Sequence, residues 1–452
     1  MQKLISKYAL AAHLAILAVA PQFFSLGPVL CLAALAFCWL IFEPSRIGDE
    51  SLLAARKRVI SSIVADPVFW LSVLVLGFCV IRFFNSGIGM AFDAEAGTWL
   101  LSQPPFPYLP ASASRCGSAE LSAAVALMVV LQGCRNAMGR MARAAFMILF
   151  SAFTGLGALV NCVLLSSGVE SVRIFAVTSF TNPQFLGVYY AMGLFCAVSG
   201  FSNVLHYRWC SSVILIIVAV VSNAAALFVF APPAVILVFV SAILVFVLYT
   251  IVWHYIKGSH SQGLICFVSM VAFMAGAVAL VMVALPEVVI SKKLAPFFGE
   301  AAFLPENFKA LHSQLSEVSL AVWKKCPWLG AGLGTFADSM KFVASSEFWK
   351  IVPPDQASPL SLHWKVLAER GAIGAFIIFS YLTLLLYTFF RRWGAAIKTF
   401  PQPSAMAGFF LFFPVALDSL YGVSMLSPGT MVAFFSILSI SASSFSKVKN
   451  NG

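Results

Sequence analysis

Apolar segments of about 18 residues or more recur along almost the whole chain, with short polar connections between them. An α-helix needs about 20 such residues to cross the hydrocarbon core of a membrane, and a helix satisfies its own backbone polar groups there. The chain of 452 residues is 61% hydrophobic and 10% charged, whereas about a quarter of the residues of a soluble domain are charged. The pattern predicts an all-α integral membrane protein.

The apolar runs place about twelve transmembrane helices in the chain. Their expected residue ranges are 5–22, 25–43, 66–84, 118–134, 145–165, 185–203, 211–230, 233–254, 264–285, 371–390, 405–421 and 430–446. One long polar segment interrupts the series before the tenth helix. The expected organisation is therefore nine transmembrane helices in residues 1–285, one large extracytoplasmic loop with short amphipathic helices in residues 286–370, and three transmembrane helices in residues 371–452.

Lysine and arginine are distributed unequally between the two faces of this layout. One face carries Lys3, Lys7, Arg46, Arg56, Lys57, Arg58, Arg135, Arg140, Arg143, Arg208, Lys257, Arg391, Arg392, Lys398, Lys447 and Lys449. The short connections of the other face carry Arg82, Arg115 and Arg173. Because basic residues are retained on the cytoplasmic side, we expect both termini inside and residues 286–370 outside. The excess of basic residues behind the net charge of +11 is explained by this retention, so no nucleic-acid partner is expected.

Local motifs exclude several enzyme classes. The ten Cys lie mostly inside apolar runs and form no C-x-x-C pair. The chain has no Walker A loop, no H-E-x-x-H, no G-x-S-x-G and no acidic pair with metal-ligand spacing. We therefore expect neither a bound metal nor a cofactor. Lys3 and Lys7 lead into a run that continues as a spanning helix, so no cleavable signal peptide is expected either.

The polar segment itself predicts two helices separated by a turn. After Pro305 an apolar stripe recurs at three- and four-residue steps, as in an amphipathic helix, at Phe308, Leu311, Leu315, Val318 and Val322. Pro327 should end this helix. The glycines that follow, Gly330, Gly332 and Gly334, predict a flexible turn. Ser358 should cap a second helix, with Pro359 at its first position. This helix should carry His363 and run straight into the span that begins near Gly371.

His363 and Arg370 are the strongest candidates for chemistry. They are seven residues apart, so on a helix they share a face two turns apart. An imidazole can accept a proton near neutral pH, and a guanidinium can hold a phosphate with two hydrogen bonds. The alternative is an interfacial histidine with an arginine that anchors the helix to lipid headgroups. Gly371 and Gly374, just beyond them, should let a neighbouring backbone approach closely.

Other charged residues leave two interpretations open. Arg173, in an expected outward loop, is either a second phosphate ligand or the partner of Glu170 three residues before it. Arg82 and Asp418 lie within or near spans, where ionisable groups are often functional. The alternative is that Arg82 simply reaches the interface, and that Asp418 belongs to a polar cluster at a helix end. The lysines of the polar segment either attract an anionic substrate or contact lipid phosphates. They include Lys292, Lys293, Lys324, Lys325, Lys341, Lys350 and Lys365.

Three patches, in this order, resemble the O-antigen ligase and O-antigen polymerase superfamily of bacterial envelope enzymes. The first is Arg173 followed by Asn182-Pro183. The second is Pro327 followed by Gly330, Gly332 and Gly334, and the third is His363 followed by Glu369-x-Gly371-x-x-Gly374. The layout of twelve spans with one large outer loop is similar too. Two features depart from the family: Trp364 follows the histidine where the family often has Asn, and the Phe230–Ala234 turn lacks the family's arginine.

The resemblance implies a metal-independent glycosyltransferase in the bacterial cytoplasmic (inner) membrane, with its active site facing the periplasm. Its donor would be a glycan linked to undecaprenyl pyrophosphate, and its acceptor a hydroxyl of a glycan or of the lipid-A core. His363 would be the base, and Arg173 and Arg370 would bind pyrophosphate. A repeat-unit polysaccharide polymerase is the alternative within this superfamily. A polysaccharide transporter or lipid flippase, or a structural assembly subunit, would be a protein of another class.

Overall fold

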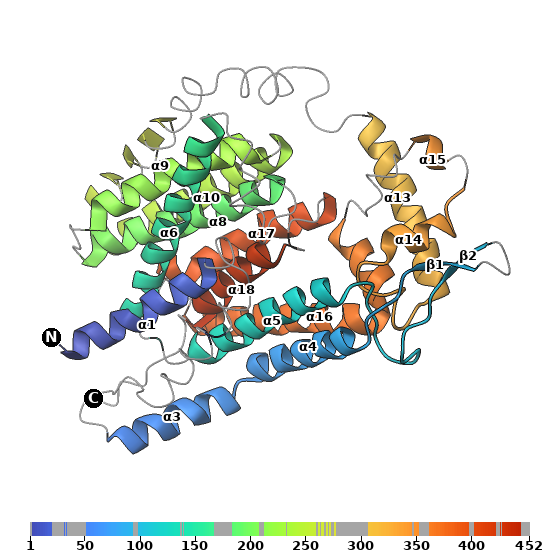
Figure 1. The fold of residues 1–452 in the computed structure, drawn as a ribbon. Coiled ribbons are helices and arrows are strands. Elements are labelled where there is room, and N and C mark those ends of the chain that lie inside the picture. The colour runs from blue at the N-terminus through green and yellow to red at the C-terminus, as the bar shows by residue number, and fades with distance from the viewer. Residues whose placement is uncertain are drawn as a thin grey trace.

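The computed structural model describes a predominantly helical protein (Figure 1). The described residues are 2–19, 31, 33, 51–93, 98–135, 138, 140–166, 183–207, 212–231, 233–258, 306–345, 348–351, 361–396, 402–421, 425 and 427–443, with short pieces between 261 and 276. The helices up to residue 256 are α1 (Gln2–Val19), α3 (Leu52–Val64), α4 (Pro67–Phe84), α5 (Arg115–Arg135), α6 (Arg140–Ser166), α8 (Pro183–Tyr207), α9 (Val213–Phe230) and α10 (Pro233–Ile256). The later helices are α13 (Glu306–Lys325), α14 (Phe336–Lys341), α15 (Phe348–Ile351), α16 (Leu362–Ala396), α17 (Pro403–Tyr421) and α18 (Pro428–Ser443).

Eight helices in the described part of the chain are long and apolar enough to cross a membrane. They are α4, α5, α6, α8, α9, α10, α16 and α17, and each coincides with one of the expected spans. The helical membrane class is therefore confirmed. The spans expected at 5–22 and 430–446 overlap α1 and the shorter apolar helix α18, while those at 25–43 and 264–285 fall almost wholly outside the described residues. The number twelve remains a prediction.

The core of the bundle is built around α8. Every residue from Phe185 to Val204 is buried, and α8 packs against α6, α9, α17 and α18. Small residues allow the helices to pack closely. A Cβ added to Gly187 of α8 would lie 2.5 Å from the Cβ of Ala231 at the end of α9. Between the neighbouring helices α6 and α9, a Cβ added to Gly155 would lie 2.7 Å from the Cα of Ala219. Close approach of backbones through such residues is how helices associate where lipid removes the hydrophobic driving force.

Helix α10, by contrast, presents apolar side chains to the outside. Leu237, Leu244, Leu248 and Val252 are among its exposed residues. An apolar outer surface of this kind suits contact with lipid acyl chains and agrees with the membrane class.

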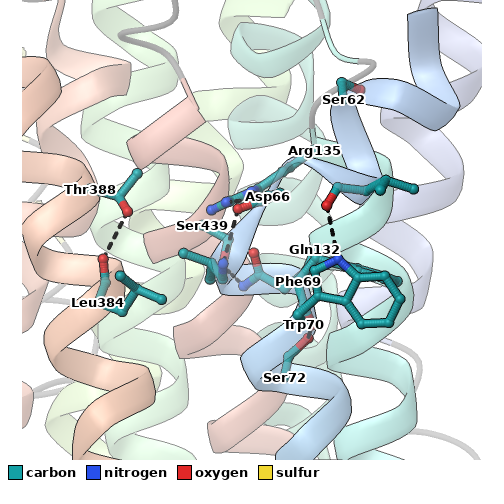
Figure 2. Close-up of polar contacts among 12 residues, drawn as sticks. Ser62, Asp66, Phe69, Trp70, Ser72, Gln132, Arg135, Leu384, Thr388 and Ser439 are labelled. Atoms are coloured by element: carbon teal, nitrogen blue, oxygen red, sulfur yellow. Dashed lines mark hydrogen bonds and ion pairs between the residues drawn. The ribbon is translucent and has the colours of Figure 1, made fainter.

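Buried polar groups join helices at a second place in the bundle (Figure 2). Asp66, the N-cap of α4, accepts the backbone N–H of Val68 and forms an ion pair with Arg135 of α5, with 2.5 Å between Nη2 and Oδ2. One turn before Arg135, the amide of Gln132 donates to the hydroxyls of Tyr381 on α16 and Ser439 on α18. These contacts fix the relative positions of four helices, because an unsatisfied polar group in an apolar interior is costly.

Two arginines occupy positions that differ from the sequence-based expectation. Arg135 and Arg143 were assigned to a connection between spans on the cytoplasmic face. Both instead lie within helices, α5 and α6, and their side chains are 0% and 3% exposed. The periodicity of the sequence could not predict the burial of Arg135. Its charge is compensated by an ion pair with Asp66, and the two residues are 69 positions apart in the chain.

The segment between α4 and α5 is more ordered than the sequence suggested. It contains an antiparallel hairpin, β1 (Met90–Asp93) and β2 (Thr98–Leu101), which the all-α expectation did not include. Asn85, the C-cap of α4, holds the chain beyond the hairpin: its amide donates to the carbonyls of Phe106 and Leu109, and its side-chain oxygen accepts the N–H of Phe106. This hairpin projects at the end of the molecule where α13, α14 and α15 gather (Figure 1).

Candidate functional site

The site is built around a break in α16. At Gly371 the backbone has φ 66° and ψ −175°, so residues 362–370 form a short helix and the longer apolar helix begins after the break. The expectation that the His363 helix runs straight into the span is therefore wrong. A break leaves the last carbonyls of one helix and the first N–H groups of the next without helical partners. Such groups must find other partners in an apolar environment.

The loop that follows α13 supplies these partners. The N–H groups of Ala331 and Gly332 donate to the carbonyls of Ala368 and Glu369, at 2.8 and 3.1 Å. In the opposite direction, the N–H groups of Ala372 and Ile373 donate to the carbonyls of Pro327 and Trp328, at 2.8 and 3.1 Å. Both ends of the break are thus satisfied by one loop, residues 327–332. We call the loop and the break together the glycine clamp.

Two glycines allow the backbones of the clamp to touch. A Cβ on Gly371 would lie 2.3 Å from the carbonyl oxygen of Trp328, and a Cβ on Gly330 would lie 2.4 Å from the carbonyl carbon of Glu369. Both residues also have positive φ, 66° and 76°, which disfavours any side chain. The glycine run is therefore a hydrogen-bonded contact surface, and the flexible turn expected from the sequence is not observed.

The remaining glycines have related roles. Gly332 and Gly334 also have positive φ, 113° and 78°. Between them, Leu333 exchanges backbone hydrogen bonds with Ala111 and Ala113 of the segment before α5. Gly374 differs from the expectation of a close backbone: its nearest neighbours are the ring of Phe78 on α4 and the Cβ of Arg370. The clamp therefore contacts the chain on both sides of the hairpin: α4 before it and the segment 111–113 after it.

An apolar cluster supports the short helix from its other side. Leu315, Val318 and Val322 of α13 are buried against α14, α15 and the short helix of α16, where Ala368 belongs to the same cluster. This confirms the amphipathic helix read from the sequence for these three positions; the side chains of Phe308 and Leu311 lie outside the described residues. Packing against α13 therefore fixes the position of the short helix, residues 362–370, that carries the candidate site.

His363 lies in the first turn of α16 and is partly exposed. Its ring is close to His312 of α13 and to the backbone of Ser419 near the end of α17. The second histidine also faces α17, with 3.4 Å between its Nε2 and the carbonyl oxygen of Leu420. The Nδ1 atom of His363 is buried and has no hydrogen-bond partner among the described residues. The ring of His363 on α16 therefore faces α13 and α17, and one of its nitrogens lacks a partner among the described residues.

Arg370 lies at the other end of the short helix, directly before the break, and is partly exposed. Glu369 beside it is 2% exposed. The carbonyl of Glu369 accepts from Gly332 and, at 3.3 Å, from the Nη2 of Arg82 on α4. Arg82 is 1% exposed, so its side chain is buried at the clamp and does not extend from the protein as an interfacial anchor would.

The structure brings together the second and third patches of the sequence analysis and leaves the first untested. Gly330 meets Glu369 and Gly371, Gly332 donates to the carbonyl of Glu369, and the carbonyl of Pro327 accepts from Ala372. Arg173 and Asn182 lie outside the described residues, as do Ser358 and Pro359. Asp418 is partly exposed in the last turn of α17, one residue from the backbone that approaches His363. Lys324, Lys325 and Lys341 are exposed around this end of the molecule.

Sequence reasoning missed the proximity of His312 to His363. A weak signal was present, because His312 follows Leu311 and precedes Leu315 by three residues, and so borders the apolar stripe of its helix. A residue in that position lies at the edge of the packed face, where it can meet a neighbouring helix.

No three His, Cys, Asp or Glu side chains gather into a metal-binding group within the ranges that the structure describes. A scan against protein-family models and a search of curated protein sequences both returned no match to this chain. The function must therefore be argued from the site and from the motifs.

Proposed function

We propose that the protein is a membrane glycosyltransferase. It transfers a glycan from an undecaprenyl-pyrophosphate carrier to an acceptor hydroxyl, of another glycan or of the lipid-A core, at the periplasmic face of the bacterial cytoplasmic membrane. The observation that carries this proposal is the glycine clamp. Two of the three patches that resemble the O-antigen ligase and polymerase superfamily pack into one hydrogen-bonded unit, and that unit ends the short helix bearing His363 and Arg370.

In the proposed reaction His363 is the general base. The acceptor oxygen forms a bond to the anomeric carbon while the bond from that carbon to the pyrophosphate oxygen breaks. The acceptor proton passes to an imidazole nitrogen, and the pyrophosphate leaves with the electron pair. His363 and Arg370 are separated by seven residues, a rise of about 10 Å along a helix. The acceptor and the leaving group lie on different sides of the sugar carbon, so the base and the pyrophosphate ligand must be separate side chains.

Arg370 stabilises the leaving group in this scheme. Its guanidinium can form paired, charge-assisted hydrogen bonds with a pyrophosphate, and Arg173 is proposed to contribute a second set. The proposed step needs no metal ion, because pyrophosphate is already a good leaving group and the arginines neutralise the charge that develops. Exposed lysines on α13 and α14 would attract an anionic lipid headgroup to the site.

A transporter or flippase is the alternative from another class, since transporters place their sites at broken helices. In such sites the freed carbonyls and N–H groups face the transported ion or substrate. Here the carbonyls of Ala368 and Glu369 and the N–H groups of Ala372 and Ile373 are occupied by the 327–332 loop. The break at Gly371 therefore favours a fixed scaffold over a substrate-binding gap. A polymerase of repeat units would use the same chemistry with a different acceptor.

The test is glycan transfer in reconstituted membranes with matched amounts of protein. His363→Ala and His363→Gln should each slow transfer about 10²- to 10⁴-fold, the usual share of general-base catalysis. Donor binding should change little, because arginines hold the donor's charge. Arg370→Ala and Arg173→Ala should weaken donor binding and slow transfer. His13→Gln, in an exposed position on α1, serves as the control. If His363→Gln retains most of the activity, His363 is not the base.

A further inference from the structure

Arg82 is a buried cation whose hydrogen-bonding capacity is largely unused. It lies in the last turn of α4 and is 1% exposed. One nitrogen, Nη2, donates to the carbonyl of Glu369, and the guanidinium carbon lies 4.6 Å from the centre of the Phe78 ring. Its Nε and Nη1 atoms are buried with no acceptor in the described chain. Donors left in this state inside a protein point to a missing partner.

The charge balance around Arg82 is also incomplete. Arg370 lies close enough to repel it, while Glu369 attracts it. Arg82 takes part in neither the Arg135–Asp66 nor the Lys341–Asp338 ion pair. Among the described residues, Arg82 and Arg370 thus share the nearby carboxylate of Glu369, and the apolar ring of Phe78 lies against the buried guanidinium. An excess positive charge in such a place is unfavourable unless an anion is present.

Arg135 is another buried arginine, and it has an acidic partner. Its side chain is 0% exposed, as deeply buried as that of Arg82, and Asp66 contacts it through both Nε and Nη2, at 3.2 and 2.5 Å. Its Nη1 atom has no hydrogen-bond partner among the described residues, but the carboxylate of Asp66 compensates its charge. No acidic side chain takes the corresponding place at Arg82 in the described ranges, so an external anion is the candidate partner.

We propose that Arg82 and Arg370 together form an anion site for a phosphate-bearing lipid headgroup, with Arg82 as its buried half. The proposal rests on the proposed function, in which Arg370 binds the pyrophosphate of the donor, and adds to it a ligand on α4. The anion enters past Arg370, which is partly exposed, and reaches the Nε and Nη1 donors of Arg82 behind it. Each of these two donors can form a charge-assisted hydrogen bond with a phosphate oxygen.

Arg82 also joins the site to the scaffold. Its Nη2 holds the carbonyl of Glu369, which ends the short helix, and that carbonyl is also held by Gly332. A structural role of this kind alone predicts that removing Arg82 destabilises the empty protein. An anion site predicts the reverse sign, because removing Arg82, a buried cation that Arg370 repels, relieves the empty protein of an uncompensated charge.

The experiment compares thermal unfolding and ligand binding in nanodiscs of digalactosyldiacylglycerol, a bilayer lipid without phosphate. The variants are Arg82→Met, Arg82→Lys and, as a matched control, Arg115→Met. Arg115 is exposed at the same end of the molecule, with its guanidinium 5.5 Å from the Phe83 ring. Without added anion, Arg82→Met should unfold at the wild-type temperature or above it. With undecaprenyl pyrophosphate in the disc, the wild type and Arg115→Met should be stabilised, and Arg82→Met should bind it about tenfold more weakly or worse.

The other arms identify the source of the phosphate and guard against misfolding. Arg82→Lys keeps the charge but loses the paired donors, so it should fold and still bind more weakly than the wild type. Stabilisation by phosphatidylglycerol discs that depends on Arg82 supports the site and assigns it to phospholipid headgroups. Equal affinity of wild type, Arg82→Met and Arg82→Lys for both lipids overturns the proposal. Binding that depends on Arg82 in a protein without transfer activity would leave the anion site standing and refute the glycosyltransferase.

Discussion

At the residue scale, Gly330 and Gly371 decide whether the glycine clamp can form. Each has a positive φ, and each lies where an added Cβ would overlap the backbone of the other segment, at 2.4 and 2.3 Å. The neighbouring atoms are backbone, so they cannot rotate away as a flexible side chain could. The position of Arg370, one residue before Gly371, therefore depends on a contact that only glycine permits.

We expect Gly371→Ala and Gly330→Ala each to destabilise the protein by more than about 2 kcal/mol, since left-handed strain and steric overlap act together. Gly77→Ala in α4 is the control. No atom lies within 4 Å of its added Cβ, so it should change stability by less than about 1 kcal/mol and in the favourable direction. Unfolding in nanodiscs measures both. Wild-type stability of Gly371→Ala would show that the break is not required.

Much of the site could be predicted at this scale, but its assembly could not. The sequence identified His363, Arg370 and both glycine groups because histidine, arginine and glycine have distinctive chemistry. It did not reveal that Gly330 touches Gly371. That contact consists of backbone hydrogen bonds, such as Ala331 to Ala368, which leave no side-chain signature. The sequence also could not predict that His363 is partly buried against α17 or that Arg82 is fully buried at the clamp. Both depend on the packing of helices that are distant in sequence.

At the element scale, the Asp66–Arg135 pair fastens the start of α4 to the end of α5 (Figure 2). Asp66 has two roles there, because it also caps α4 through the N–H of Val68. Asparagine preserves a capping oxygen but removes the charge. The substitution Asp66→Asn therefore separates the cap from the ion pair. It leaves Arg135, which is 0% exposed, with an uncompensated charge.

We expect Asp66→Asn to destabilise the protein by about 3–5 kcal/mol, the usual effect of breaking a buried pair on one side. The double variant Asp66→Asn with Arg135→Met should recover most of this loss, because no unpaired charge remains. As the comparison, Lys341→Met removes an exposed pair with Asp338 at 3.3 Å and should cost about 1 kcal/mol or less. Unfolding of these variants, of Arg135→Met and of the wild type in nanodiscs gives the coupling energy of the pair. A double variant as unstable as Asp66→Asn would contradict the argument.

Elements differed in how well the sequence predicted them. The spans from 66–84 to 233–254 match α4 to α10 because their apolar length is itself the physical requirement for crossing a membrane. The break in α16 was missed, since an isolated glycine in a helical pattern is usually tolerated. The strands of the hairpin, four residues each, are too short to show a period. Its position depends on Asn85, whose amide binds carbonyls more than twenty residues further along the chain.

At the scale of the whole molecule, the contacts predict which segments share a face of the membrane. Helix α4 has 18 residues and is long enough to cross once. Helix α3 precedes it, whereas the segment after it is bridged to the clamp through Ser112 and Leu333. Figure 1 shows α3 and the α13–α15 group at opposite ends of α4. Residues 51–64 and 306–345 should therefore lie on opposite sides of the membrane. The segment 51–64, which carries Arg56, Lys57 and Arg58, should be the cytoplasmic one.

Cysteine labelling in intact cells tests this arrangement. Ser51 and Ser345 are both exposed, so a cysteine at either position should react with a thiol reagent that reaches it. In a chain with its native cysteines replaced by alanine, Ser345→Cys should react with a membrane-impermeant reagent added outside. Ser51→Cys should react only after the cells are permeabilised, which serves as its positive control. Labelling of both positions from outside would refute a single crossing by α4. Labelling of Ser51→Cys alone would reverse the orientation and move His363 to the cytoplasmic face, where a periplasmic glycan transfer could not occur.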